Sequence, residues 1–121
     1  MNFINLTPHD IDIELENGTR VTIPKSGTVA RVSQESFPTD GCEIEIDDEW
    51  LLIPVSHPVY GEVEGLPPFD PENPHLIYLV SAMVANTPAA IARMDVYAPD
   101  TGPTAIREDG RIVAVRGLVQ Y

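Results

Sequence analysis

The stretch DIDIELENGTRVTIP, residues 10–24, decides the fold class that the sequence predicts. Apolar and polar residues alternate on both sides of Asn17-Gly18, and the apolar ones are Ile11, Ile13, Leu15, Val21 and Ile23. Alternation of this kind is typical of a half-buried strand, and Asn-Gly favours the tight turn between two antiparallel strands. The stretch therefore predicts a β-hairpin.

Further strand patterns follow in the first half of the chain. Residues 27–33, GTVARVS, carry Val29 and Val32 and predict a third strand. Residues 42–55, CEIEIDDEWLLIPV, alternate at first, pass through an acidic turn and end in a continuous apolar run. Because such a run is typical of a strand covered on both faces, we expect residues 50–55 to be buried.

The second half predicts a loop, a strand, a helical segment and a closing hairpin. Residues 61–75 hold four prolines and two glycines, which favours a structured loop. The apolar run LIYLV, residues 76–80, predicts a buried strand, and a helix begins at Ser81 as a candidate N-cap. Thr87-Pro88 fits a helix start, so the helix kinks or restarts there. Asp109-Gly110 predicts the last hairpin.

These patterns together predict an α+β fold with a mainly antiparallel β core, one or two short helices after residue 80 and a C-terminal hairpin. The chain of 121 residues is long enough to bury a core without metals or disulfides, so we expect one domain over residues 1–121. The helical segment presents Ala82, Met83 and Ile91, and we expect an obligate oligomer to cover this apolar face.

The charge balance limits the partners of the protein. There are 19 acidic residues against 7 basic ones, a net charge of -12, which repels nucleic-acid backbones and anionic lipid. We therefore expect no DNA partner and no membrane partner, and neither a signal peptide nor a membrane span is predicted. Cys42 is the only cysteine, so no internal disulfide forms and the cytoplasm is the expected location.

No motif for catalysis or metal binding occurs in the sequence. His9, His57 and His75 lack the spacing of a metal site, and no nucleophile elbow, phosphate-binding loop or dinucleotide fingerprint is present. Cys42 stands beside Glu43, whose charge disfavours a reactive thiolate. We expect neither enzymatic activity nor a bound metal or cofactor.

Three arginines are the strongest functional signal. Arg107, Arg111 and Arg116 lie within ten residues around the predicted C-terminal turn. A guanidinium group binds phosphate through two parallel hydrogen bonds, which makes the three residues candidates for an anion site. The alternative is that they form surface ion pairs with neighbours such as Glu108, Asp109 or Asp100.

The loop before this hairpin and the strand-to-helix junction add polar groups to the candidate site. The loop APDTGPT, residues 98–104, offers two hydroxyl groups and free backbone N–H groups, and the junction offers the start of a helix. Aromatic rings could stack on a base, although a strand tyrosine is more often a core residue. The added candidates are Ser81, Asp100, Thr101, Thr104, Phe69, Tyr78 and Tyr97.

Five stretches in order carry a resemblance that covers nearly the whole chain: INLTPHDI, IPKSGTVARV, YGEVEGLP, IYLVSAMVA and DVYAPDTGPTAIREDGRIVAVRG. In this order they resemble a group of small proteins of phages and prophages, and within it the first Thoeris anti-defence family. That family sequesters cyclic ADP-ribose-type immune signals. The chain differs from the family pattern at Pro88 and in the 98–104 loop.

The resemblance implies an antiparallel β core with a helix, dimers that assemble into hexamers, and a pocket between protomers that binds glycocyclic ADP-ribose without cleaving it. Some relatives also hold cyclic trinucleotides at separate sites, so cyclic oligonucleotides are a further expected class of ligand. It further implies aromatic and amide contacts from Phe69 or Tyr78 and from Asn86, and phosphate contacts from Arg107, Arg111 and Arg116. The implied location is the cytoplasm of an infected bacterial host.

Two other functions stay open from the sequence. One is a small virion or assembly protein with no ligand, and the other is a small enzyme that processes nucleotides. The three hypotheses differ in what happens to a nucleotide. A signal-binding protein binds it intact, an assembly protein does not bind it, and an enzyme changes it chemically.

Overall fold

The computed structural model describes residues 2–38 and 41–121. Residue contacts divide the chain, predicted as one domain, into two units. The first, here called the core unit, joins Met1–Arg31 to Val63–Tyr121, and the second, here called the hairpin unit, is Val32–Glu62. The chain is rich in strands and has two short helices, so the predicted α+β class is confirmed.

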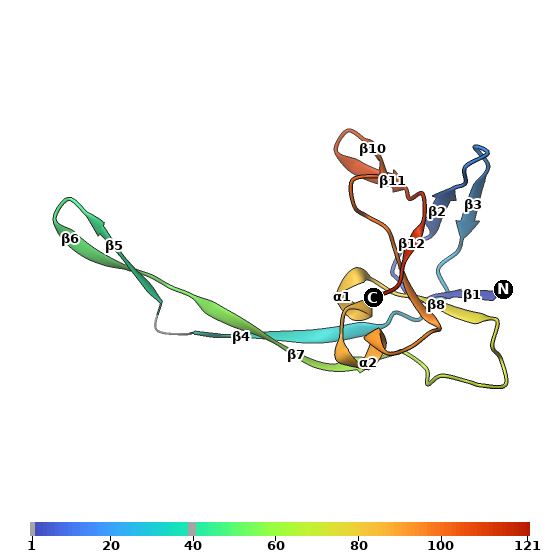
Figure 1. The fold of residues 1–121 in the computed structure, drawn as a ribbon, viewed down its shortest axis with the longest axis horizontal. Helices are drawn as coiled ribbons and strands as arrows, with labels where there is room; N and C mark the ends of the chain where they lie inside the picture. Colours follow the sequence, from blue (N-terminus) through green and yellow to red (C-terminus); the bar gives the residue numbers. More distant parts are fainter. Residues whose placement is uncertain (1, 39–40) are drawn as a thin grey trace. The chain divides into compact units, whose positions relative to one another are not determined.

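The core unit is built on a four-stranded sheet with the order β1-β8-β9-β12 (Figure 1). Its strands are β1 (Asn2–Asn5), β8 (Leu76–Leu79), β9 (Val96–Pro99) and β12 (Leu118–Val119). The β8 strand lies between two parallel neighbours, β1 and β9, while β12 runs antiparallel to β9. Parallel strands are covered on both faces, which explains the continuous apolar sequence of β8.

Both predicted hairpins of the core unit are confirmed. The first joins β2 (Ile11–Glu14) to β3 (Arg20–Ile23), and the second joins β10 (Ile106–Glu108) to β11 (Arg111–Ala114). The second turn places Asp109 and Gly110 at φ 51° and 79°. Both values lie in the left-handed region that a two-residue hairpin turn requires.

The helical segment consists of two short helices, α1 (Ala82–Ala85) and α2 (Pro88–Ile91). The predicted N-cap is confirmed, because the Ser81 hydroxyl accepts a hydrogen bond from the Val84 N–H at 3.3 Å. Of the two predicted outcomes at Thr87-Pro88, the restart is the one observed. Proline fits the first position of a helix because the N–H it lacks has no partner there.

A buried asparagine connects the sheet to the first hairpin. Asn5, 1% exposed, donates from its side-chain amide to the carbonyl groups of His9 and Ile23 at 2.8 and 2.9 Å. Its Oδ1 accepts from the backbone N–H and the hydroxyl of Thr7 at 2.9 and 2.6 Å. Every hydrogen-bonding position of this amide therefore has a partner at the end of β1.

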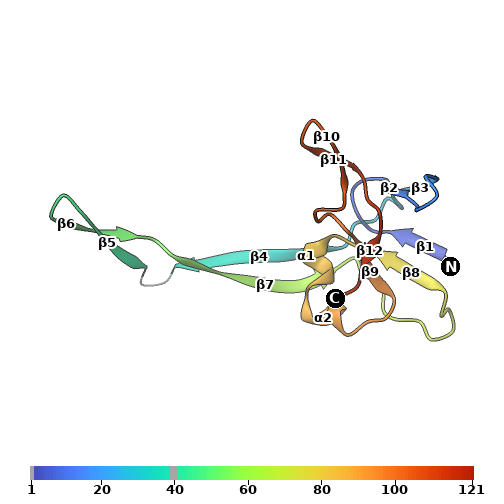
Figure 2. The ribbon, with the colours of Figure 1, turned by 45° about the horizontal axis from the view of Figure 1, so that its top comes forward.

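The hairpin unit contains two nested strand pairs, seen in Figures 1 and 2. The outer pair is β4 (Arg31–Pro38) with β7 (Ser56–Glu64), and the inner pair is β5 (Cys42–Ile46) with β6 (Glu49–Ile53). The third strand of the sequence prediction is thus β4, which begins after Val29. The predicted loop begins only after β7, so its first four residues belong to a strand.

The prediction that residues 50–55 are buried is wrong. No described residue of the hairpin unit is buried, and Trp50 and Leu52 are 66% and 61% exposed. The strands form where the pattern places them, but no second layer from the described part of the chain covers them. A continuous apolar run indicates that a strand needs covering and does not identify what covers it.

Replacement of Asn5 by alanine tests its role in the core unit. We expect Asn5→Ala to lower the free energy of unfolding by about 2 kcal/mol or more, because several buried backbone groups lose their partner together. Asn73→Ala is the matched control, since the exposed Asn73 amide donates only to the Asp70 carboxylate, and it should cost less than about 1 kcal/mol. Urea denaturation measures both, and equal losses would contradict the assignment.

Candidate functional site

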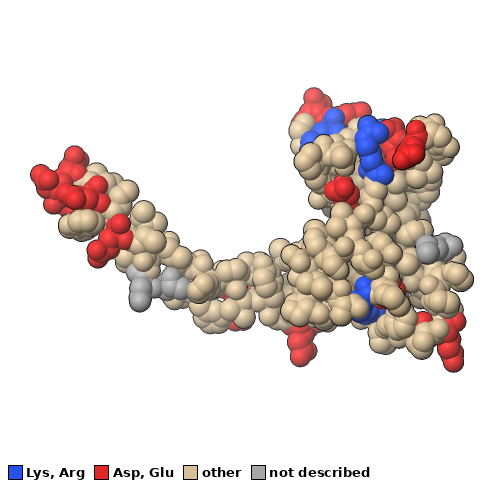
Figure 3. Space-filling model, viewed as in Figure 1, with Lys and Arg blue, Asp and Glu red and all other residues tan. Residues whose placement is uncertain are grey.

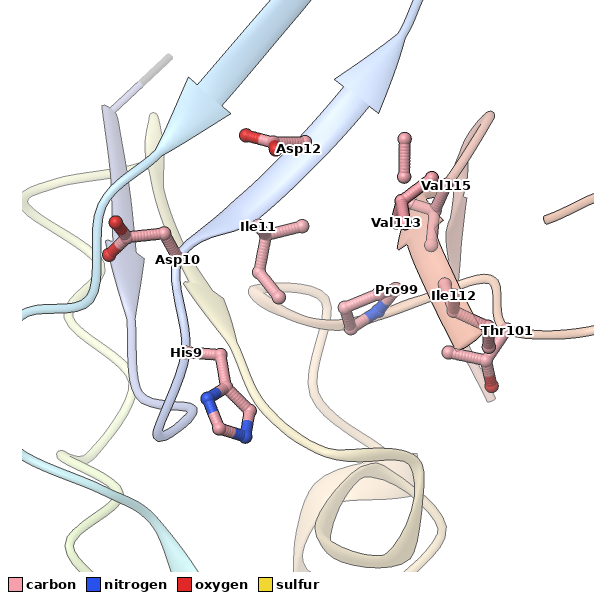
Figure 4. A pocket seen from close by; sticks show the side chains of 10 residues that line it. His9, Asp10, Ile11, Asp12, Pro99, Thr101, Ile112, Val113 and Val115 are labelled. Carbon is pink, nitrogen blue, oxygen red and sulfur yellow. The ribbon is translucent and has the colours of Figure 1, made fainter. Parts of the chain in front are cut away.

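A pocket of about 220 Å³ lies in the core unit (Figure 4). Three segments line it: residues 9–12 at the start of β2, Pro99 with Thr101, and residues 112–115 of and just after β11. The first and last of these are about a hundred positions apart in the sequence. The pocket therefore depends on tertiary structure and not on a local motif.

Backbone hydrogen bonds hold the two strands at the pocket together. The Glu14 N–H donates to the Val115 carbonyl at 2.8 Å, and the Val115 N–H donates to the Asp12 carbonyl at 2.9 Å. These bonds form a parallel bridge between Ile13 and Val115. The C-terminal hairpin is thereby attached to the N-terminal one.

The facing walls of the pocket are apolar. In Figure 4 the Ile11 side chain points toward Pro99 and Ile112, whereas the carboxylates of Asp10 and Asp12 point away from them. Each carboxylate has its own donor near β3: the Lys25 backbone N–H at 2.9 Å for Asp10 and the Thr22 hydroxyl for Asp12. The pocket therefore offers surface for an apolar or aromatic group.

The size of the pocket limits what it can hold. Pockets for drug-sized ligands have volumes of about 300–1,000 Å³, and this one is smaller. No lysine or arginine lines it, so it does not by itself neutralise a phosphate. A single ring, such as a nucleobase, fits these properties better than a whole dinucleotide.

Arg107 fixes the loop at the edge of the pocket. Its Nη2 donates to the carbonyl groups of Thr101 and Gly102 at 3.0 and 3.2 Å, and its Nη1 donates to that of Ala105 at 3.3 Å. The Asp100 carboxylate accepts from the Gly102 N–H at 3.0 Å within the same loop. Both side chains therefore hold the loop in its shape. The guanidinium of Arg107 already donates three hydrogen bonds to carbonyl groups of this loop.

The other two arginines of the candidate site differ from each other. Arg116 pairs with Glu14 at 3.2 Å, and Glu14 also pairs with Arg20 at 3.4 Å. The ion-pair alternative thus holds for Arg116, but its partner is Glu14 and not one of the three acidic residues named from the sequence. The side chain of the exposed Arg111 forms no hydrogen bond or ion pair with residues 2–38 or 41–121. It is the member of the trio with all its donors available.

Tyr78 belongs to the core and is not a stacking surface for a ligand. Its side chain lies on β8 at 5% exposure, and the Arg93 guanidinium lies 5.8 Å from its ring centroid. Arg93 also forms two hydrogen bonds with Asp95, at 2.9 and 2.8 Å, and one with the Pro67 carbonyl at 2.7 Å. The sequence prediction did not single out Arg93, although the Arg-x-Asp spacing on either side of Met94 indicates a local pair.

The remaining sequence candidates lie outside the pocket, and Thr101 is the one predicted residue that lines it. Ser81 is the N-cap of α1 and Asn86 is its C-cap. Phe69 lies in the 65–75 loop and is 44% exposed, and Thr104 is exposed as well. The tyrosine of β9, Tyr97, is half-buried. Sequence reasoning missed the other nine residues that line the pocket, among them His9, Ile11, Pro99 and Ile112, because they carry no recognisable motif.

Residues 2–38 and 41–121 contain no group of three or more His, Cys, Asp or Glu residues arranged to hold a metal ion. Within the same residues, no helix has the length and apolar character needed to cross a membrane.

The different roles of Arg107 and Arg111 predict different effects on stability. Arg107→Ala should lower the free energy of unfolding by about 1 kcal/mol, because three loop carbonyl groups lose a charged donor at a partly exposed site. Arg111→Ala on the same hairpin is the matched control and should change it by less than about 0.5 kcal/mol. Thermal and urea denaturation of both variants checks this, and the reverse order would contradict the assigned contacts.

A scan against protein-family models, a search of curated proteins and a search of solved structures found no match to this chain. The residues around the pocket are therefore the basis on which a function can be proposed.

Proposed function

We propose that the protein binds and sequesters a small cyclic nucleotide signal of the glycocyclic ADP-ribose type without cleaving it, as an anti-defence protein of a phage in the bacterial cytoplasm. The observation that supports this most is the apolar, ring-sized pocket bordered by the 98–104 loop and by the strand that begins at Arg111. The resemblance in sequence supplies the class of ligand.

In this proposal the parts of the ligand occupy different places. A base lies between Ile11, Pro99 and Ile112, because an aromatic ring gains most from an apolar pocket. The phosphates lie outside the pocket, near Arg111 and the Thr101 hydroxyl. Arg107 acts indirectly by holding the loop, since its donors already bind loop carbonyl groups.

The two carboxylates that line the pocket are placed for binding and not for acid–base catalysis. They accept hydrogen bonds from residues at β3 and point away from the apolar walls. A general acid or base must reach the atom that it protonates or deprotonates. These carboxylates do not face the space where the ligand would sit.

A second candidate function is an assembly protein with no small ligand. The hairpin unit favours it, because its apolar side chains are exposed and lack a covering layer in the chain. The two functions are compatible, since the pocket and these side chains belong to different units.

A ligand screen distinguishes the candidates. We expect a cyclic ADP-ribose isomer to raise the melting temperature in proportion to the logarithm of its concentration above the dissociation constant. Mass spectrometry after heat release should recover that ligand with unchanged mass. Cyclic oligonucleotides belong in the same screen. A changed mass would indicate an enzyme, and no shift with any nucleotide would leave the assembly function.

Replacement of Arg111 tests the phosphate contact. We expect Arg111→Ala to weaken binding of the best ligand by about ten-fold or more, because a charged hydrogen bond is lost. Arg111→Lys should restore part of the affinity, because lysine keeps the charge but not the planar pair of donors. Arg20→Ala is the control, because Arg20 is an exposed arginine that pairs with Glu14 and does not line the pocket. Calorimetric titration measures all three, and unchanged affinity of Arg111→Ala would remove the phosphate from this hairpin.

A further inference from the structure

One face of the inner ladder of the hairpin unit combines carboxylates with apolar side chains. Residues paired across an antiparallel ladder share a face, and alternate residues of a strand point to opposite faces. The pairs Glu45↔Trp50 and Glu43↔Leu52 therefore lie on the same side, here called the carboxylate face. Trp50 and Leu52 are 66% and 61% exposed, so the described residues of the chain leave this face uncovered.

The two strands contribute different chemistry to this face. A row of two carboxylates, Glu43 and Glu45, comes from β5, and a row of two apolar side chains, Leu52 and Trp50, comes from β6. Neighbours within a row are about 7 Å apart along the strand, and partners across the rows have Cβ atoms about 5 Å apart. Each carboxylate therefore has an exposed apolar side chain directly beside it.

This arrangement matches the two parts of a lysine or arginine side chain. Both residues have an apolar stem, which packs on apolar surface, and a cationic head, which pairs with a carboxylate. An arginine head also stacks on the ring of a tryptophan. One basic side chain can therefore contact Trp50 and Glu45 together, and a second one can contact Leu52 and Glu43.

The charge of the hairpin unit selects a basic occupant. Residues 32–62 contain eight acidic residues and no lysine or arginine, so this unit has a net charge of -8 and the rest of the chain has -4. Figure 3 shows acidic atoms gathered at the end of β5 and β6. Nucleic acids, anionic membranes and the same unit of a second copy are repelled by such a surface. A positively charged partner is attracted to it.

We propose that the carboxylate face docks a basic, extended segment of a partner protein. Alternate side chains of an extended segment point the same way, as they do in the ladder, so lysine or arginine at every second position meets Glu43 and Glu45 in turn. Their stems lie over Leu52 and Trp50. A small cation pairs with a carboxylate and leaves the apolar row uncovered, whereas such a segment covers both rows.

Trp50 is the only tryptophan of the chain, so its fluorescence reports binding at this face directly. The probe is a capped peptide in which arginine alternates with threonine. We expect this peptide to shift the Trp50 emission of the full-length chain to shorter wavelength, because the arginine stems displace water from the ring. The affinity should fall as salt is added, since the paired charges lie at the surface. Spermine at the same charge concentration should not produce the shift.

Two pairs of glutamine substitutions separate this face from the general charge of the chain. Glu43→Gln with Glu45→Gln should raise the dissociation constant of the peptide at least about five-fold, because two ion pairs are lost. Glu16→Gln with Glu108→Gln removes the same charge from exposed positions of the core unit. This control should change the constant by less than about two-fold, because distant surface charges are screened. Calorimetric titration measures both.

Two adjacent leucines test the apolar row. Leu52 lies on the carboxylate face and Leu51 on the opposite face, and both are exposed, at 61% and 45%. Leu52→Ala should weaken peptide binding at least about three-fold, because apolar contact with an arginine stem is lost, and Leu51→Ala should weaken it by less than about two-fold. Circular dichroism should show that both variants keep the native fold.

Four results would overturn the proposal. Absence of any response of Trp50 to the peptide would leave the face without this occupant. Equal weakening by the two pairs of glutamine variants would mean that binding follows total charge. The same emission shift with spermine would make the face a site for any polycation. A shift of Trp50 emission on concentrating the chain alone would assign the face to a second copy.

Discussion

The buried side-chain amide of Asn5 is the interaction on which the rest of the core unit depends. Asn5 is the last residue of β1, and its amide donates to the carbonyl groups of His9, just before the first hairpin, and of Ile23, the last residue of that hairpin. A buried amide that uses all of its donors and acceptors fixes the chain around it in one arrangement, since any shift leaves a polar group without a partner. Because β2 in turn bridges to Val115, the position of the C-terminal hairpin and of the pocket follows from it.

The three arginines of the C-terminal hairpin lie close together in the sequence, but their side chains have different partners. Arg107 satisfies loop carbonyl groups, Arg116 shares Glu14 with Arg20, and Arg111 extends from the surface. Surface ion pairs of this kind contribute little to stability. Of the three, Arg111 is the one whose guanidinium has no partner among residues 2–38 and 41–121, so it is the candidate for a single phosphate contact.

The core unit and the hairpin unit differ in how far their apolar side chains are buried. In the core unit, β8 is covered within the chain, and Leu79 is fully buried. In the hairpin unit the apolar residues are sorted by register onto one face of the inner ladder and opposed by carboxylates on the other. The two units therefore differ in whether the described residues of the chain itself cover their apolar side chains.

The sequence by itself determined the local structure of this protein. Asn17-Gly18 and Asp109-Gly110 specify their turns, Ser81 caps its helix and Thr87-Pro88 restarts it, because each depends on the conformational limits of a few neighbouring residues. Tertiary structure alone decided the parallel pairing of β1, β8 and β9, the exposure of residues 50–55 and the pocket between Ile11 and Ile112. Each of these depends on segments distant in sequence. An apolar strand has the same pattern whether its own chain or a partner covers it.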